Sequence, residues 1–236
     1  MRGAFFVWAL LGGCAAVPHP PAPAKDAGAP TIELVKPFGV PGEEMHYSAA
    51  LRGLPVGKLV TAVGKLGWVE GRKAIIVKSR GQSTGMIALL AELTYELTTT
   101  IDLDRGHVID SREESWAVFA GEKEHELSTI GDDGRHDVHS AAAAVRAWRS
   151  LPGQTGQLRV DVGSSTVDVH LRDAGRGFLV SAGEPAVRYE GLVEDRIKVT
   201  AWVSDDTARV PLRFECDIPT FGQLVIDLAH YTAPAD

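Results

Sequence analysis

From Gly42 onward, apolar and polar side chains alternate with a period of two residues. In the clearest segment, every second residue from Leu93 to Leu103 is Leu, Tyr, Thr or Ile, and the residues between them are Thr, Glu or Asp. One dry and one wet face is typical of antiparallel strands, because parallel strands are buried on both faces. The same alternation recurs in segments 158–172, 197–203, 210–218 and 224–228, and the chain as a whole is predicted to contain about eleven strands.

Two segments interrupt this alternation and predict helices, residues 83–92 and residues 140–151, the second with Ser140 as its expected N-cap. In the first helix, Met86-Ile87-Ala88-Leu89-Leu90 is apolar on nearly all sides and has to be covered by a concave surface. We therefore expect a mainly β fold, a strongly bent antiparallel sheet that forms an open half-barrel or a barrel. The apolar helix is expected to pack in its concave side.

The amino terminus predicts export and a lipid anchor. Basic Met1-Arg2-Gly3 precedes the apolar segment 4–11, which falls short of the roughly 20 residues that a spanning helix needs. Leu11-Gly12-Gly13-Cys14 then resembles the lipobox of bacterial lipoproteins. The resemblance implies a signal peptide of residues 1–13 and acylation of Cys14, and Ala15 after it implies the periplasmic side of the outer membrane. A plain cleaved signal with an incidental cysteine is the alternative.

Proline content indicates where the folded domain begins. Seven of the 13 prolines fall between residues 18 and 41, so residues 14–41 are expected to be an extended tether. A single β-rich domain is expected over residues 42–232, followed by a short tail, residues 233–236. Its bent sheet is similar in shape to the lipoprotein carriers of the bacterial envelope.

Charge and cysteine content narrow the chemistry. Lys and Arg number 24 against 31 Asp and Glu, and this net charge of -7 argues against a nucleic-acid partner. With Cys14 acylated, Cys216 has no partner for a disulfide and is predicted to be a core thiol, on the buried face of a strand with Phe214 and Ile218. We expect no cofactor, and the oligomeric state stays open.

The histidines offer one weak metal hypothesis. The stretch His136-Asp137-Val138-His139 groups two histidines that could bind zinc with His125 or His170 as a third ligand. No helical H-E-x-x-H and no cysteine pair supports such a site, so we expect no metal and a solvated turn before the second helix.

The sequence also contains a candidate catalytic serine, Ser83. Gly81-Gln82-Ser83-Thr84-Gly85 matches the G-x-S-x-G nucleophile elbow, and Asp206 and His230 follow in the order Ser, Asp, His. An elbow of that type belongs to parallel strands with crossover helices, whereas the flanking segments predict antiparallel hairpins. We therefore expect Ser83 to cap the apolar helix.

A further motif carries a family resemblance. Trp202-Val203-Ser204-Asp205-Asp206 leads into Arg209-Val210-Pro211, and this W-x-S-D-D-x-x-R-x-P pattern resembles an exported bacterial family of unknown function. The resemblance implies a cell-envelope location and no known activity. Ser204, Asp205, Asp206 and Arg209 are predicted to form a structural turn whose side chains bond backbone N–H groups, with Arg209 pairing to a carboxylate. A paired-carboxylate site or a cation site is the alternative.

These observations favour a non-catalytic outer-membrane lipoprotein that binds an apolar or amphipathic ligand, or an envelope partner. Two alternatives are a serine hydrolase that uses Ser83 and a structural scaffold of an envelope complex. The candidate ligand contacts are the apolar residues of the first helix and the strand after it, namely Met86, Ile87, Leu89, Leu90 and Tyr95.

Overall fold

The computed structural model describes residues 39–119, 121–163 and 165–234. The expected signal peptide, Cys14 and most of the expected tether lie outside these residues. Within the described part of the chain, no helix has both the length and the apolar character needed to cross a bilayer.

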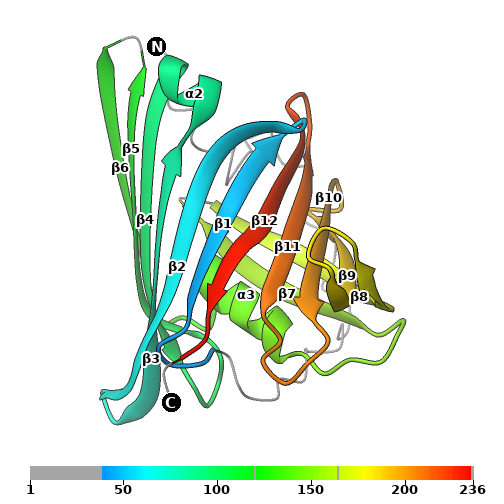
Figure 1. Cartoon of the computed structure of the whole chain (residues 1–236). Coiled ribbons are helices and arrows are strands. Elements are labelled where there is room, and N and C mark those ends of the chain that lie inside the picture. The colour runs from blue at the N-terminus through cyan, green and yellow to red at the C-terminus, as the bar shows by residue number, and fades with distance from the viewer. Residues whose placement is uncertain (1–38, 120, 164, 235–236) are drawn as a thin grey trace.

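Twelve strands form one sheet in which every neighbouring pair is antiparallel, in the spatial order β6-β5-β4-β3-β2-β1-β12-β11-β10-β9-β8-β7. The sheet bends round on itself into a nearly closed barrel (Figure 1). The predicted fold class is thus confirmed. The strands are β1 (Glu44–Leu51), β2 (Leu54–Val69), β3 (Arg72–Ser83), β4 (Ala91–Asp102), β5 (Val108–Phe119), β6 (Glu122–Gly131), β7 (Thr155–Val162), β8 (Ser165–Leu179), β9 (Glu184–Val193), β10 (Ile197–Ser204), β11 (Pro211–Ile218) and β12 (Gly222–Thr232).

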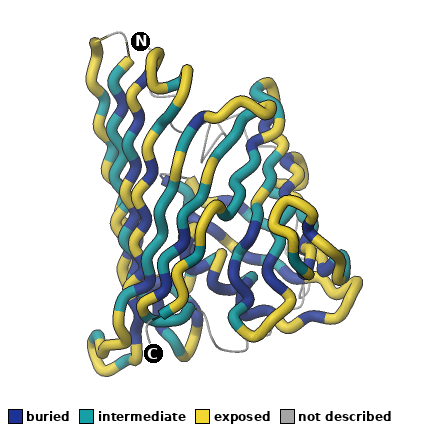
Figure 2. Tube along the Cα trace, in the orientation of Figure 1, coloured by how far each residue is buried: buried dark blue, intermediate teal, exposed yellow. Residues whose placement is uncertain are grey.

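The alternating pattern is what bends the sheet. In β4, the odd-numbered residues from Leu93 to Ile101 are all 8% exposed or less, while Glu92 and Glu96 on the other face are exposed. Figure 2 shows buried positions recurring between more exposed ones along the strands. Six strand pairs also carry a shift in register, and such bulges add local bend and twist to a sheet.

The barrel is not closed by a strand ladder. Its edge strands are β6 and β7, and within the described residues no ladder joins them. The Ser128 hydroxyl of β6 donates to the Gly163 carbonyl at 2.9 Å, and the Gly163 amide donates to the Glu113 carboxylate at 3.2 Å. Along β7, His136 forms a short parallel bridge with Val160. We call this line of contacts between the two edges the seam.

Helix α3 (Val138–Ala147) fills the concave side of the sheet (Figure 1). Ala143 and Ala147 belong to a buried cluster that includes side chains of β1 to β4, whereas Ala144 and Trp148 pack against β7 to β10. Alanine combines high helix propensity with a small side chain, so both halves of the sheet can approach the helix closely.

The prediction of which helix lies inside was wrong. Helix α2 (Gly85–Leu90) has no buried residue and lies at one end of the barrel, where it connects β3 to β4. Six residues make less than two turns, too little to fill the concave side that the ten residues of α3 occupy.

The start of α3 also differs from the expected one. The N-cap is Asp137, whose carboxylate accepts from the Ser140 amide at 2.8 Å, while the Ser140 hydroxyl accepts from the Asp137 amide at 2.9 Å. Ser140 is therefore the third residue of a capping box and not the cap itself.

Cys216 is partly buried and packs against two of the hydrophobic clusters, as a core thiol should. Ile218 is 6% exposed, but Phe214 is 38% exposed and was wrongly placed in the core.

Candidate functional site

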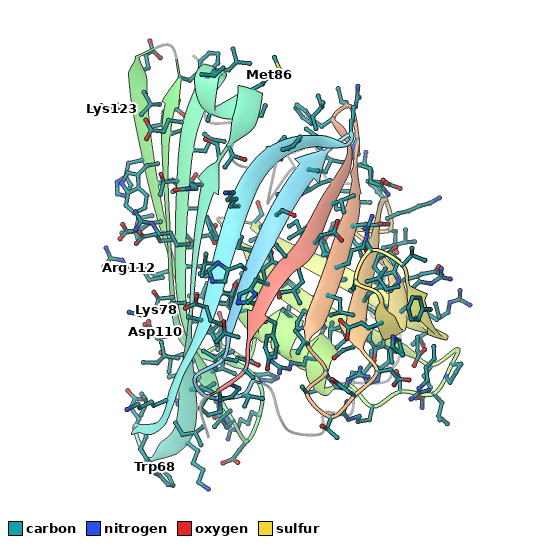
Figure 3. All side chains as sticks on the ribbon, in the orientation of Figure 1. Trp68, Lys78, Met86, Asp110, Arg112 and Lys123 are labelled. Carbon is teal, nitrogen blue, oxygen red and sulfur yellow. The ribbon has the colours of Figure 1, made fainter. Side chains whose placement is uncertain are left out.

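The end of the barrel that carries α2 exposes an apolar surface, which we call the mouth. Met86 is 72% exposed, Leu89 86% and Leu90 64%, and Phe119 at the end of β5 is 55% exposed. Figure 3 shows Met86 projecting at this end of the barrel. Exposed apolar side chains gathered in this way are typical of surfaces that contact a protein, a membrane or a ligand.

A hollow of about 500 Å3 lies in the mouth. Its lining comes from α2, the first residues of β4 and the end of β5, namely Ala88, Leu89, Leu90, Ala91, Glu92, Val118, Phe119 and Gly121. Ile87 does not line it. Ile87 instead packs inward between two small clusters, one with Val56 and Leu224 and one with Leu93. The inward Ile87 holds the short helix against the barrel, and this leaves the outer side chains of α2 exposed.

Two of the predicted ligand contacts thus line the hollow, Leu89 and Leu90, and Met86 lies on the same exposed helix. Tyr95 does not join them. Tyr95 is 8% exposed inside the barrel, two residues beyond Leu93 on the same face, and burial raises the pKa of its hydroxyl well above the usual value. Sequence periodicity assigned Tyr95 to the correct face but could not reveal that this position lies deeper than the mouth.

Below the mouth the inner wall of β5 and β6 is acidic. Glu113 faces inward and burial raises the pKa of its carboxyl group. Glu124 and Glu126 of β6 pair in register with Ala117 and Ser115 of β5 on the same wall. An apolar entrance above an acidic wall suits an amphipathic molecule better than a wholly apolar one.

A chain of hydrogen bonds at the start of α3 was not predicted. His139 contacts the Ser79 hydroxyl through Nε2 at 2.6 Å and the Thr99 hydroxyl through Nδ1 at 2.8 Å, and Thr99 donates its only hydroxyl proton to Asp137. His139 must therefore donate from Nδ1 to Thr99. The neutral ring then accepts at Nε2 from Ser79, whose oxygen accepts from Thr61 at 2.7 Å. Burial lowers the pKa of His139 to about 4, so the ring is neutral near pH 7.

This Ser–His–Thr–Asp series anchors the interior helix. Ser79 is 6% exposed and His139 8%, and none of the residues in the series lines the hollow. The series provides hydrogen-bond partners for buried polar groups, which would destabilise the barrel interior if they were left unpaired.

Ser83 lies at the end of β3, opposite Gly57 of β2. Its hydroxyl donates to the Ala91 carbonyl at 3.1 Å and accepts from the Leu93 amide at 3.0 Å, so it joins β3 to β4 across the base of α2. The predicted capping role was wrong, because the N-cap of α2 is Thr84 and that residue makes no side-chain cap bond.

The other features of the G-x-S-x-G string also have local explanations. Gly85 has a φ of 62°, and a Cβ there would lie 2.9 Å from the Pro55 carbonyl oxygen, so only glycine fits this turn. His230 lies on β12, and because β1 and β2 intervene, β12 is about 14 Å across the sheet from β3 at roughly 4.8 Å per strand. His230 is also in register with Arg80 of β3, three residues before Ser83. Ser83 and His230 are too far apart for a hydrogen bond.

Replacing Ser83 with alanine is expected to lower the free energy of unfolding by about 1–2 kcal/mol, because two hydrogen bonds are lost. A fluorophosphonate probe is expected not to label Ser83, since its hydroxyl is engaged with the backbone. Urea unfolding and probe labelling of the wild type check both points, with the exposed Ser165→Ala as the control. Labelling that disappears only in Ser83→Ala would support the hydrolase alternative.

The W-x-S-D-D segment forms the predicted turn between β10 and β11. The Ser204 hydroxyl donates to the Asp206 carboxylate at 2.7 Å and accepts from the Val210 amide at 2.8 Å, and the Arg209 amide donates to Asp206 at 2.8 Å. Asp205 forms an ion pair with Arg176 at 3.2 Å.

Among the described residues, the side chain of Arg209 does not make the predicted pair with a carboxylate. Its guanidinium donates to the carbonyl oxygens of Arg146 and Trp148 at 2.9 and 3.2 Å and to the Tyr189 hydroxyl at 2.5 Å. These carbonyls lie at the carboxyl end of α3, where a buried cation satisfies them and opposes the helix dipole. The motif therefore holds the interior helix in place.

A buried ion pair secures the same end of α3. Arg146 makes a bidentate pair with Glu43, with Nη2 donating to Oε2 at 2.9 Å, and donates from Nε to the Ala208 carbonyl at 2.8 Å. The Arg146 and Glu43 side chains are 3% and 0% exposed, and Tyr231 donates to Glu43 at 3.2 Å. We call Glu43, Arg146 and Arg209 the α3 clamp.

No protein-family model matches the chain, and no curated protein matches it in sequence. Among solved structures, a β-barrel-like protein of the domain of unknown function DUF1849 from Brucella abortus is similar, with 10% identity, a TM-score of 0.50, and coverage of 82% of this chain and 98% of that chain. This likeness supports the barrel-like fold alone.

Two further structures match more loosely. One is described as an exported protein with a YmcC-like fold from Bacteroides fragilis, with 11% identity, a TM-score of 0.37, and coverage of 86% of this chain and 100% of that chain. The other is described as a lipoprotein from Parabacteroides distasonis, with 8% identity, a TM-score of 0.29, and coverage of 83% and 98%.

Proposed function

We propose that this chain is a non-catalytic cell-envelope lipoprotein that binds an apolar or amphipathic ligand at the mouth of its barrel. The anchor is acylated Cys14 on the periplasmic side of the outer membrane, and the lipobox-like segment at residues 11–14 supports it. The W-x-S-D-D resemblance to exported proteins is consistent with this location.

One observation carries the binding proposal, namely the exposed side chains of α2 around the hollow. Helix α3 and the inward side chains of the strands form the buried clusters of the barrel, whereas Leu89 and Leu90 of α2 are exposed where they line the hollow. A volume of about 500 Å3 falls within the range of small-molecule sites.

We expect Leu89→Asp to weaken binding of a fluorescent fatty acid at least tenfold. An apolar side chain contributes about 1.5–3 kcal/mol when it is buried, and 1.4 kcal/mol corresponds to a factor of ten in affinity. The measurement is a fluorescence titration of the fragment 39–236, which contains all twelve strands, with cis-parinaric acid.

Val180→Asp is the matched control, because Val180 is 84% exposed in the turn between β8 and β9 and does not line the hollow. It is expected to bind like the wild type. Absence of binding by the wild-type fragment, or equal affinity of Leu89→Asp and Val180→Asp, would remove the ligand from the proposal and favour a protein partner.

A further inference from the structure

A second apolar surface lies at the opposite end of the barrel. The turn between β2 and β3 forms a hairpin tip, residues 65–73, in which Leu66 is 61% exposed and Trp68 69%. Figure 3 shows Trp68 at the end of the molecule opposite to Met86. Eleven residues of β3 separate this tip from the mouth, which corresponds to about 36 Å at roughly 3.3 Å per residue.

The exposed groups of the tip share one face. Trp68 pairs in register with Lys73, and paired residues point to the same side of a hairpin. The Lys73 ammonium lies 5.9 Å from the centre of the Trp68 ring, and Leu66 is two residues before Trp68. An indole, an aliphatic side chain and an ammonium group side by side match the headgroup region of a bilayer, where tryptophan and lysine are both favoured.

Charge distinguishes this end from the mouth. The hairpin tip, residues 65–73, carries three basic side chains and one acidic one, with Arg72 paired to Asp132 at 2.5 Å, in a chain whose net charge is -7. At the mouth, residues 122–126 carry three glutamates and one lysine. Because an anionic lipid surface attracts basic side chains and repels acidic ones, such a surface attracts the hairpin tip and repels the mouth.

The chain that precedes the domain joins it beside this hairpin. The Gly42 amide donates to the Val63 carbonyl at 2.8 Å and the Val63 amide donates to the Glu43 carbonyl at 2.9 Å. Val63 is five residues from Trp68, or about 17 Å along the strand, but nine residues, about 30 Å, from the start of β2 near the mouth. The segment that carries Cys14 therefore reaches the domain closer to the tip than to the mouth.

We propose that the β2–β3 hairpin tip rests on the anionic lipid surface to which Cys14 is anchored, with Leu66 and Trp68 in the headgroup region. This inference depends on the anchor of the proposed function. Its consequence is an orientation in which the mouth points away from the membrane, toward ligands or partners in the periplasm.

The test uses the full chain reconstituted in phosphatidylethanolamine/phosphatidylglycerol vesicles whose acyl chains are brominated. Bromine quenches only indoles that touch the bilayer, so part of the tryptophan emission is expected to be quenched. Trp68→Phe is expected to remove most of the quenched share, whereas Trp116→Phe, on the outer face of β5, is expected to retain it. Leu66→Asp and vesicles of phosphatidylcholine alone are each expected to reduce the quenching at least twofold.

Equal quenching in wild type and Trp68→Phe would overturn the proposal. So would a dimer that Leu66→Asp separates in sedimentation, since the tip would then be an interface between two copies. Flotation with the vesicles reports the anchor separately. A chain that floats without quenching of Trp68 retains the anchor of the proposed function and loses the hairpin contact.

Discussion

Replacing Arg146 with methionine is expected to lower the free energy of unfolding by about 3–5 kcal/mol, because the Glu43 carboxylate is left buried without its cation. Glu43 would retain its bonds from Tyr231 and from the Val40 amide, but neither group carries a positive charge. Urea unfolding followed by circular dichroism measures the loss. At roughly 2–4 °C per kcal/mol for a domain of this size, the melting temperature should fall by about 6–20 °C.

The double variant Glu43→Gln, Arg146→Met distinguishes two effects, the loss of the ion pair and the burial of one charge without its partner. It is expected to recover part of the stability, because the buried site then holds no charge. Arg172→Met breaks a surface ion pair with Glu190 and should cost less than about 1 kcal/mol. If Arg146→Met were no more damaging than Arg172→Met, the α3 clamp would not determine the stability of the barrel.

Mild acid is expected to destabilise the protein through the two histidines at the start of α3. Burial lowers the pKa of His136 to about 4, with His107 adding to the effect and Asp137 opposing it, and burial likewise lowers the pKa of His139 to about 4. The unfolded chain binds these protons near pH 6.5, so stability is complete above that pH and is lost as the pH falls toward 4.

The expected slope is about 1.4 kcal/mol per pH unit for each histidine, or up to about 2.7 kcal/mol for both. Glu113 acts in the opposite direction, because its raised pKa lets the folded state bind that proton more tightly. Urea midpoints between pH 6.5 and 4.5 measure the slope. His139→Gln should remove about half of it, and the exposed His230→Gln should leave it unchanged. A wild-type slope near zero that His139→Gln leaves unchanged would mean that the folded and unfolded chains bind these histidine protons at the same pH.

The strands of the sheet were predictable because the sequence of each strand shows which of its faces is buried. A strand with one buried face must alternate, and β4 does so from Leu93 to Ile101. Which helix fills the sheet was not predictable in this way. The residues of α2 are more apolar than the alanines of α3. Burial inside the barrel, however, depends on how long the helix is and on how closely the strands can approach it. Helix α3 has ten residues against six in α2, and its small alanine side chains let the strands come close.

The hydrogen-bonded interior shows a second limit. Thr99 belongs to the apolar face of the β4 pattern, which hinted at an inward hydroxyl, but nothing local to the sequence joins it to His139, 40 residues away. The same holds for Glu43 and Arg146, which are 103 residues apart. Isolated polar residues in a sequence do not reveal their partners, whereas local turns such as Ser204 to Arg209 do, because their bonds span few residues.

The seam is the place where this barrel can widen most easily. Around the rest of the circumference, widening would have to break a ladder of main-chain hydrogen bonds. At the seam, the main-chain bonds of the described residues are confined to the His136–Val160 bridge, and the bonds from Ser128 to Gly163 and from Gly163 to Glu113 each involve a side chain. If the barrel widens to admit a larger ligand, the opening would therefore start between β6 and β7, and the other ten strands would stay hydrogen-bonded to one another.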